Sequence, residues 1–318
     1  MKNSYKTLLI ILFVFISNVA LGATNRYWVA NIDDCVDGKC LWSQSQNWSA
    51  SSGGGGGATA PTTSSYNVWF DSGSSVDAYL DMDIPHTVKI NQLKLQNTYS
   101  GTLYLNGYHL AVSNNIVVSN GATIVIDGSA TEPYTGLGPY LQTYKDFAIY
   151  SGGTVTVSGD ASRLKVKKRL RIWGAFTAPN GDNTRFIVRG AFNLYRGGTF
   201  DHNSGTVNMN TNGTGYVINI EDGPGENRNF YNLYKQNSKT VSLSNDIEIE
   251  NDLTVTSTGT IKAGSNDITI GGDWVVASSS NFNDGTGKVI FNGSSAQIID
   301  SPANFNDVQI SNSDVSLS

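Results

Sequence analysis

The chain is poor in cysteine, proline, methionine and charge. Its 318 residues include 2 Cys, 7 Pro and 3 Met, and charged residues make up 15%, against about 25% in ordinary soluble proteins. The net charge of -5 is modest and acidic, which disfavours a general nucleic-acid binder. After the N-terminal segment, no stretch shows the apolar periodicity of an amphipathic helix. We therefore expect an all-β protein that does not bind nucleic acid.

Short strand-like runs fill the chain from about residue 86 onward. They alternate apolar with polar residues and end in Asn, Gly, Ser or Asp, as in TVKINQ, GTLYLNG, ATIVIDG, TVTVSGD and DITIGGD. Hydrophobic residues still make up 39% of the chain, so a core can form. The runs recur about every six to eight residues, closer than the eight to twelve typical of antiparallel sandwiches. This spacing favours a coil that turns corners over a chain that reverses direction.

An internal repeat supports a solenoid. The segment GAFNLYRGGTFDHNSGTVNMN aligns without a gap on GDWVVASSSNFNDGTGKVIFN further along the chain. Paired positions carry similar side chains: Phe192 with Trp274, Phe200 with Phe282, and Val207 with Val289. A second pair of similar segments starts at Phe230 and Phe305. A repeat of about 75 to 82 residues would fit three or four coils of about 20 to 25 residues, each with three short strands. We predict a right-handed parallel β-helix of roughly ten coils over residues 86 to 318.

The two ends of the chain add expectations about export and completeness. Residues 1 to 22 combine Lys2 and Lys6 with a short apolar run and a small-residue end, the layout of a secretory signal peptide. The apolar run is too short to span a bilayer, and no later segment approaches that length. We expect a secreted or cell-surface protein, with no membrane span after cleavage. Residues 23 to 85, rich in Trp and Gly, would form an N-terminal capping segment. The repeat stops inside a strand at Ser318, which favours a C-terminally truncated fragment of a longer protein.

The two cysteines lie in CVDGKC, where Asp37 and Gly38 form a favoured pair for a two-residue hairpin turn. Cys35 and Cys40 would then face each other where cross-strand side chains approach most closely. This geometry predicts a disulfide, which export allows. A metal or redox site is disfavoured, because no CxxC is present and the histidines are distant in sequence: His86, His109 and His202. We predict no metal and no cofactor.

Four tryptophans near the N-terminus have two possible roles. They are Trp28, Trp42, Trp48 and Trp69. Flat indole rings can stack on the apolar faces of sugars, which would make this group a carbohydrate-binding platform. The alternative, which we favour, is that the rings cover the apolar end of the first coil.

The sequence ASRLKVKKRLRIW alternates basic and apolar residues, with Lys168 as the exception. If it forms one strand, five basic side chains share one face: Arg163, Lys165, Lys167, Arg169 and Arg171. This basic ladder could bind an anionic polysaccharide, lipopolysaccharide or nucleic acid. The alternative is structural, because charged side chains discourage edge pairing, and acids on adjacent coils could neutralise them.

Several segments together resemble large secreted bacterial surface proteins. RYWV, NWS, SSGGGGGA and NVWFD look like their Trp-rich opening module, and FYNL, VSLSNDIEIENDLTV, GGDWVV and KVIFNGS look like their repeats. The resemblance implies a β-helical adhesin or filamentous surface protein, with an extracellular polysaccharide or a host or neighbouring cell surface as partner. The insert DDCVDGKC departs from the common form, which has a short Gly-rich turn there. We therefore expect a non-catalytic structural or adhesive segment.

A third reading is a polysaccharide lyase or hydrolase on a β-helix. Such sites need two or three carboxylates converging on one groove. The closest local pair is Asp81 and Asp83, and the loop that would wall a groove is 129 to 146. Three further carboxylates would have to be brought together by the coil register: Asp160, Asp201 and Asp222. We disfavour this reading, because loops long enough to wall a groove are scarce.

Overall fold

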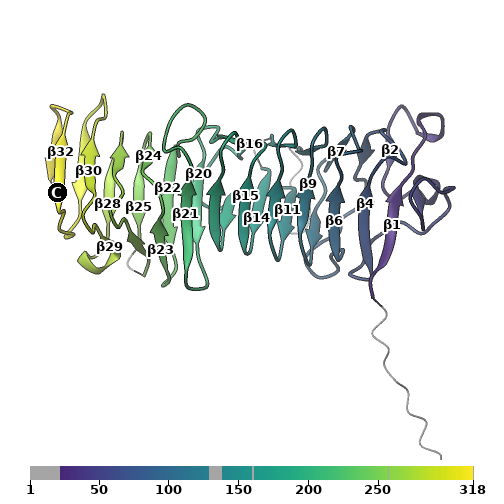
Figure 1. Ribbon diagram of the computed structural model, residues 1–318, viewed down its shortest axis with the longest axis horizontal. Coiled ribbons are helices and arrows are strands. Elements are labelled where there is room, and N and C mark those ends of the chain that lie inside the picture. Colours follow the sequence, from purple (N-terminus) through teal and green to yellow (C-terminus); the bar gives the residue numbers. More distant parts are fainter. Residues whose placement is uncertain (1–21, 129–137, 160, 257, 318) are drawn as a thin grey trace, which may run out of the picture.

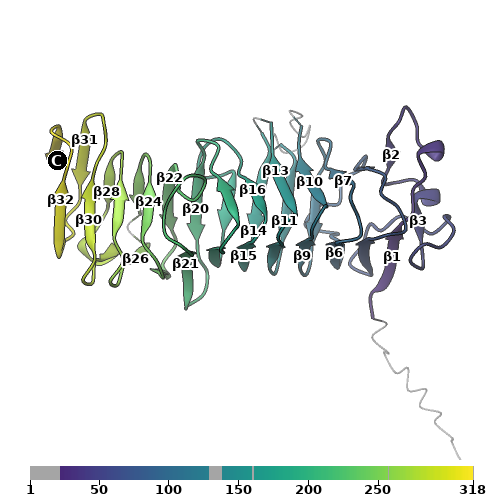
Figure 2. The same ribbon diagram turned by 45° about the horizontal axis from the view of Figure 1, so that its top comes forward.

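The computed structural model describes residues 22–128, 138–159, 161–256 and 258–317, and these form one elongated stack of β-coils (Figures 1 and 2). The predicted signal peptide at 1–22 lies almost entirely outside the described residues. Successive coils follow one another along the stack in chain order, from β1 (purple) at one end to β32 (yellow) at the other (Figure 1). The prediction of an all-β parallel β-helix is confirmed.

Four sheets run along the stack, and we call each a wall. The twelve-stranded wall contains, in spatial order, β29 (Phe282–Asn283), β26 (Thr260–Lys262), β23 (Thr240–Leu243), β21 (Tyr216–Ile220), β18 (Ala191–Leu194), β15 (Arg169–Ile172), β12 (Phe147–Ile149), β9 (Ile116–Val118), β6 (Gln92–Leu95), β4 (Tyr66–Phe70), β1 (Thr24–Trp28) and β3 (Trp48–Ser49). The seven-stranded wall contains β19 (Thr199–Asp201), β16 (Ala175–Thr177), β13 (Thr154–Val157), β10 (Thr123–Ile126), β7 (Thr102–Tyr104), β5 (Ala78–Tyr79) and β2 (Cys40–Leu41).

The other two walls complete the coils. The ten-stranded wall contains β33 (Val315–Leu317), β31 (Gln297–Asp300), β28 (Trp274–Val276), β25 (Leu253–Val255), β22 (Asn232–Gln236), β20 (Thr206–Asn210), β17 (Phe186–Val188), β14 (Arg163–Val166), β11 (Tyr140–Thr143) and β8 (Leu110–Val112). The four-stranded wall contains β24 (Ile247–Ile249), β27 (Ile268–Ile270), β30 (Lys288–Phe291) and β32 (Asp307–Ile310). Short 3-10 turns are η1 (Ile32–Asp34), η2 (Ser45–Asn47) and η3 (Ser279–Asn281).

A typical coil uses three walls in a fixed order. The chain passes from the ten-stranded wall to the twelve-stranded wall and then to the seven-stranded wall, as in β11, β12 and β13. In the C-terminal coils the four-stranded wall takes the third place, as in β22, β23 and β24. Every strand pair is parallel and in register except the antiparallel pair of β1 with β3 among the named strands. This confirms three short strands per coil.

The core follows from strand alternation. In β15, Leu170 and Ile172 are fully buried, while Arg169 and Arg171, which alternate with them, point outward. Leu170 is in register with Phe147 of the preceding coil and Phe192 of the next, so apolar side chains stack along the axis. Burial of one such side chain contributes about 1.5–3 kcal/mol. The continuous stack therefore supplies the main stabilising term.

The internal repeat does not match whole coils. Phe192 lies on the twelve-stranded wall, but its partner Trp274 lies on the ten-stranded wall. The other pairs shift by one wall in the same sense, from β19 to β29 and from β20 to β30. The interpretation of the repeat as three or four complete coils is therefore wrong. What repeats is a local strand, corner and strand unit, which can start on any wall.

The repeated glycines mark those corners. A Cβ on Gly205 would lie 2.1 Å from the carbonyl oxygen of Pro179, and one on Gly287 would lie 2.0 Å from that of Asn266. Both contacts are with the preceding coil, and they are far shorter than non-bonded contacts allow. Glycine is required there because the backbones of adjacent coils approach closely.

The twelve-stranded wall continues across residue 86, where the sequence predicts the end of the capping segment. β1 pairs in parallel with β4, and β4 pairs in parallel with β6. Asparagine side chains continue across the same region, with Asn91 donating to Asn67 at 2.6 Å and Asn114 donating to Asn91 at 2.6 Å. Residues from 24 onward therefore share the twelve-stranded and seven-stranded walls of the later coils, whereas the ten-stranded wall begins at β8.

Candidate ligand-binding surfaces

The hairpin at the cysteines has the predicted geometry. Asp37 and Gly38 have φ angles of 50° and 73°, and Val36 and Lys39 exchange both backbone hydrogen bonds. This pairing places Cys35 and Cys40 opposite each other with Cα atoms 4.4 Å apart, and they form a disulfide. Among the described residues, no group of His, Cys, Asp or Glu is arranged to hold a metal ion.

Removing this disulfide is expected to have a modest and local effect. It closes a loop of only five residues in sequence separation, for which chain entropy gives about 2 kcal/mol at most. We expect Cys35→Ser/Cys40→Ser to lower the thermal midpoint by a few degrees. Hydrogen exchange should increase around residues 31–42 and stay unchanged in the central coils. Loss of protection throughout the stack would contradict this expectation.

Three of the four N-terminal tryptophans are in the core. Trp28, Trp42 and Trp48 have no exposed surface, and Trp48 packs edge-on against the other two rings at centroid distances of 5.0 and 4.7 Å. Each indole N–H donates to a backbone carbonyl: Trp28 to Val76, Trp42 to Pro61 and Trp48 to Trp42. A ring with no accessible face cannot stack on a sugar, so these three rings do not form the sugar platform.

Trp69 is separate from that cluster. It lies half-buried on the outer side of β4, stacked beside Tyr27 at 6.2 Å, with the Lys94 ammonium 4.5 Å from its ring centre. Its N–H donates to Asn25 at 3.2 Å. The sequence grouped Trp69 with the others because they are near in the chain, whereas strand alternation places it on the opposite face.

The basic ladder divides between two walls. Arg163 and Lys165 lie on β14 of the ten-stranded wall, Arg169 and Arg171 lie on β15 of the twelve-stranded wall, and Lys167 lies at the corner between them. The prediction that all five side chains share one face of one strand is therefore wrong. Lys168, where the alternation breaks, marks the corner.

The two arginines on the twelve-stranded wall share one carboxylate as their ion-pair partner. Arg169 and Arg171 form ion pairs with Asp146 of the preceding coil at 3.1 and 3.2 Å. This is the structural alternative for the ladder, in which acids on adjacent coils match the bases. The surface next to them, bounded by Asn193, Tyr195 and Tyr216, forms an open depression of about 460 Å³.

The ten-stranded wall instead gathers additional positive charge. The register of β14 with β17 places Arg185 beside Arg163 and Arg189 beside Lys167. Neighbouring strands are about 4.8 Å apart. We call this set the basic wall: Arg163, Lys165, Lys167, Arg185 and Arg189. The sequence reasoning missed Arg185 and Arg189, which lie in TRFIVRG one coil later. Aligning TRFIVRG below SRLKVKK at the coil spacing would have found them.

The basic wall has little internal compensation. Among the described residues, none of its five cations forms an ion pair. Burial lowers the pKa of Lys165, and the positive charges of Arg189 and Lys167 lower it further. The Lys167 ammonium lies 3.5 Å from the ring centre of Tyr144, which Lys89 also approaches at 5.0 Å. The wall is thus a region of positive potential on an acidic protein.

The carboxylates of the enzyme reading have separate local partners. Asp160 and the first half of the loop at 129–146 lie outside the described residues. The other four are engaged as follows: Asp81 accepts from Ser43, Asp83 from the His109 N–H, Asp201 from the Asn203 N–H, and Asp222 pairs with Arg196. These contacts are typical of corner-stabilising roles.

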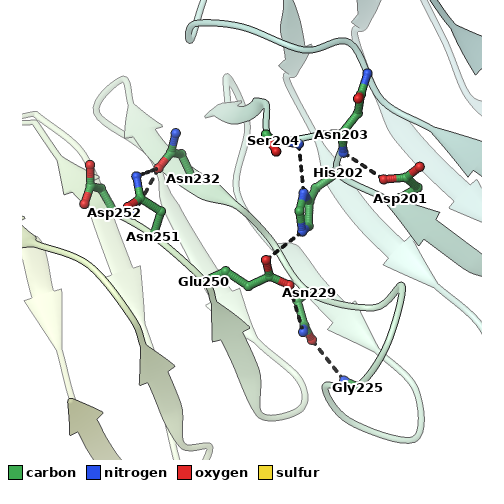
Figure 3. A network of polar contacts seen from close by, with 10 residues as sticks. All are labelled: Asp201, His202, Asn203, Ser204, Gly225, Asn229, Asn232, Glu250, Asn251 and Asp252. Carbon is green, nitrogen blue, oxygen red and sulfur yellow. Dashed lines mark hydrogen bonds and ion pairs between the residues drawn. The ribbon is translucent and has the colours of Figure 1, made fainter. Parts of the chain in front are cut away.

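A polar network links the seven-stranded wall to the four-stranded wall (Figure 3). His202 follows β19, and its Nε2 lies 3.1 Å from an oxygen of Glu250, which follows β24. The Ser204 N–H donates to the other ring nitrogen, Nδ1, at 3.0 Å. These two contacts join two coils through one side chain.

No helix of the described residues has the length and apolar character needed to cross a bilayer. Compared with family models, with curated proteins and with solved structures, the chain finds no match.

Proposed function

We propose that this protein is an extracellular, non-catalytic β-solenoid that binds an anionic polysaccharide along its basic wall. The observation that carries the proposal is the convergence of five cations from two coils along one side of the stack, none of which forms an ion pair with another described residue. Repeated charges on a rigid surface suit a polymer with repeated anionic groups, because several weak contacts then form on one chain. An adhesive or surface role follows from this binding.

Two features support the extracellular location. The N-terminal sequence has the layout of a signal peptide, and a disulfide between Cys35 and Cys40 is typical of oxidising compartments. The elongated stack separates its two ends, so one wall can present a ligand site while the ends contact other material (Figure 1).

The test compares two charge-matched double variants, with heparin and polygalacturonate as probes. Lys167→Gln/Arg189→Gln removes two charges from the basic wall, and Arg169→Gln/Arg171→Gln removes two from the twelve-stranded wall. We expect the first to weaken polymer binding at least tenfold, since a hydrogen bond to a charged group contributes about 1.5–3 kcal/mol. The second should change binding less than threefold.

Salt provides an independent measurement. Affinity for both polymers should fall steeply between low and physiological ionic strength, because the Debye length shortens to about 8 Å. An equal loss of polymer affinity in the two double variants would show that the polymers are attracted non-specifically to any basic side chain. No measurable binding of either polymer to the wild-type protein would refute the proposal.

A further inference from the structure

The basic wall contains a cavity at its N-terminal side. Its lining includes residues of β11 and β14, which pair side by side (Figure 2). Its volume is about 170 Å³, and seven polar side chains line it: His86, Tyr140, Gln142, Arg163, Lys165, Thr184 and Arg185. Drug-sized ligands occupy roughly 300–1,000 Å³. This cavity therefore suits one charged group and part of one sugar ring.

The cavity presents donors that have no acceptor. Gln142 is only 6% exposed, and its amide nitrogen finds no hydrogen-bond partner among the residues described. Arg163 Nε and Arg185 Nη1 are also buried and without an acceptor in the described part of the chain. Leaving a buried donor unpaired costs about 1–3 kcal/mol. Three such donors around one cavity indicate a site that an acceptor completes.

The nearby charges favour an anion over a neutral acceptor. Asp182, three residues before Arg185, already accepts from the backbone and hydroxyl of Thr184 at 2.9 and 2.6 Å. These hydrogen bonds lower the pKa of Asp182, and the positive charges of Arg185 and Arg163 lower it further. Asp182 therefore remains a solvated carboxylate bound to its own turn. The guanidinium groups of Arg163 and Arg185 and the ammonium of Lys165 keep the cavity positive.

We propose that this cavity is a subsite for a single sugar ring carrying a carboxylate or sulfate group. The anionic group would accept from Gln142, Arg163 and Arg185, and the Tyr140 ring and the Ile187 side chain would contact the apolar part of the sugar. That the ligand is a sugar rests on the proposed function. That it is an anion rests on the cavity alone.

The experiment measures binding of monosaccharides by calorimetry to the full chain. The charged probes are methyl galacturonoside and galactose 6-sulfate, with methyl galactoside as the neutral control and inorganic sulfate as the sugar-free control. We expect at least one charged sugar to bind at least fivefold more tightly than both controls. The ratio between the two charged sugars identifies the preferred anionic group.

Site variants locate the binding. Gln142→Leu and Arg163→Gln should each weaken binding of the charged sugar at least fivefold, while Lys262→Gln, on β26 outside both the cavity and the basic wall, should change its affinity less than twofold. Arg163 is partly exposed, so its variant keeps the test valid if Gln142→Leu fails to fold. In the wild-type protein, NMR signals of the His86 ring should shift on binding and those of His202 should not.

The outcomes separate this proposal from the broader one. If the polymers bind through Lys167 and Arg189 but no charged monosaccharide responds to Gln142→Leu or Arg163→Gln, the subsite is refuted and the proposed function stands. If charged monosaccharides bind at the cavity but polymer binding does not change in Lys167→Gln/Arg189→Gln, the subsite stands and polymer binding along the basic wall is refuted. Equal affinity for inorganic sulfate and the charged sugars would refute recognition of a sugar.

Discussion

Replacing Trp48 by alanine is expected to destabilise the N-terminal coils by about 3–5 kcal/mol, the usual cost of removing a buried tryptophan. Trp48 packs on Trp28, Trp42 and Phe70 and has no exposed surface. It also belongs to β3, the last strand of the twelve-stranded wall. Because each coil of a solenoid contacts only its neighbours, the loss should unfold the first coils before the central ones.

Hydrogen exchange measured by mass spectrometry checks this expectation. Protection should fall in residues 24–80 and remain in the coils after β11. The matched control is Trp69→Ala, which removes the same side chain from the outer face and should cost less than about 1 kcal/mol. Trp48→Phe should lower the stability by an amount between those of Trp48→Ala and Trp69→Ala, since it keeps an aromatic ring but loses the hydrogen bond to the Trp42 carbonyl. Equal effects of Trp48→Ala and Trp69→Ala would contradict the buried cluster.

The second large effect concerns a lysine inside the core. Lys235 on β22 has no exposed surface and lies in register between Met209 and Val255. Its ammonium donates to the carbonyls of Gln236 and Asn237 at 2.7 and 2.9 Å. Burial lowers its pKa from 10.5 to about 8. A depression of this size corresponds to about 3 kcal/mol of lost stability at neutral pH.

We therefore expect Lys235→Met to stabilise the protein by about 2–3 kcal/mol at pH 7 and to raise the thermal midpoint by several degrees. The depressed pKa also sets the pH dependence. Below pH 8 the lysine is charged in both the folded and the unfolded protein, and burial of its charge lowers the stability by the full amount. Between pH 8 and 10.5 only the unfolded state holds the proton, so wild-type stability rises with pH.

The difference in the free energy of unfolding between the wild-type protein and Lys235→Met should consequently shrink as the pH is raised from 8 to 10.5. Denaturant unfolding at a series of pH values measures it. Lys262→Met on the exposed side of β26 is the control and should change stability by less than about 0.5 kcal/mol at every pH. A destabilised Lys235→Met at pH 7 would show that the two carbonyl hydrogen bonds outweigh the cost of burying the charge.

The sequence predicted local structure well, because alternation and turn chemistry act over a few residues. The hairpin at Cys35 and Cys40 could be derived from one Asp-Gly pair, and the strand faces from period-two patterning. Trp69 was misplaced because it was grouped with its neighbours in the chain although the alternation in β4 puts it on the outer face. Lys167 was misplaced because it lies at an unrecognised corner between β14 and β15. A corner of one or two residues redirects the chain, and composition alone does not reveal it.

The basic wall could not be predicted without the coil register. Arg185 and Arg189 are distant from Arg163 in sequence, and only the pairing of β14 with β17 brings them together. The separation of Arg169 and Arg171 from the same set depends on the corner at Lys168. The cavity beside Gln142 depends further on packing between His86 and Tyr140, which are 54 residues apart.

The one-wall offset of the internal repeat has a consequence for how such a chain can diversify. Because the two copies differ by a non-integral number of coils, equivalent residues point in different directions around the axis. A binding patch that arose in one copy would be displayed by the other on another side of the rod. Duplication here would produce a fibre with several differently oriented faces, rather than one continuous strip of identical sites.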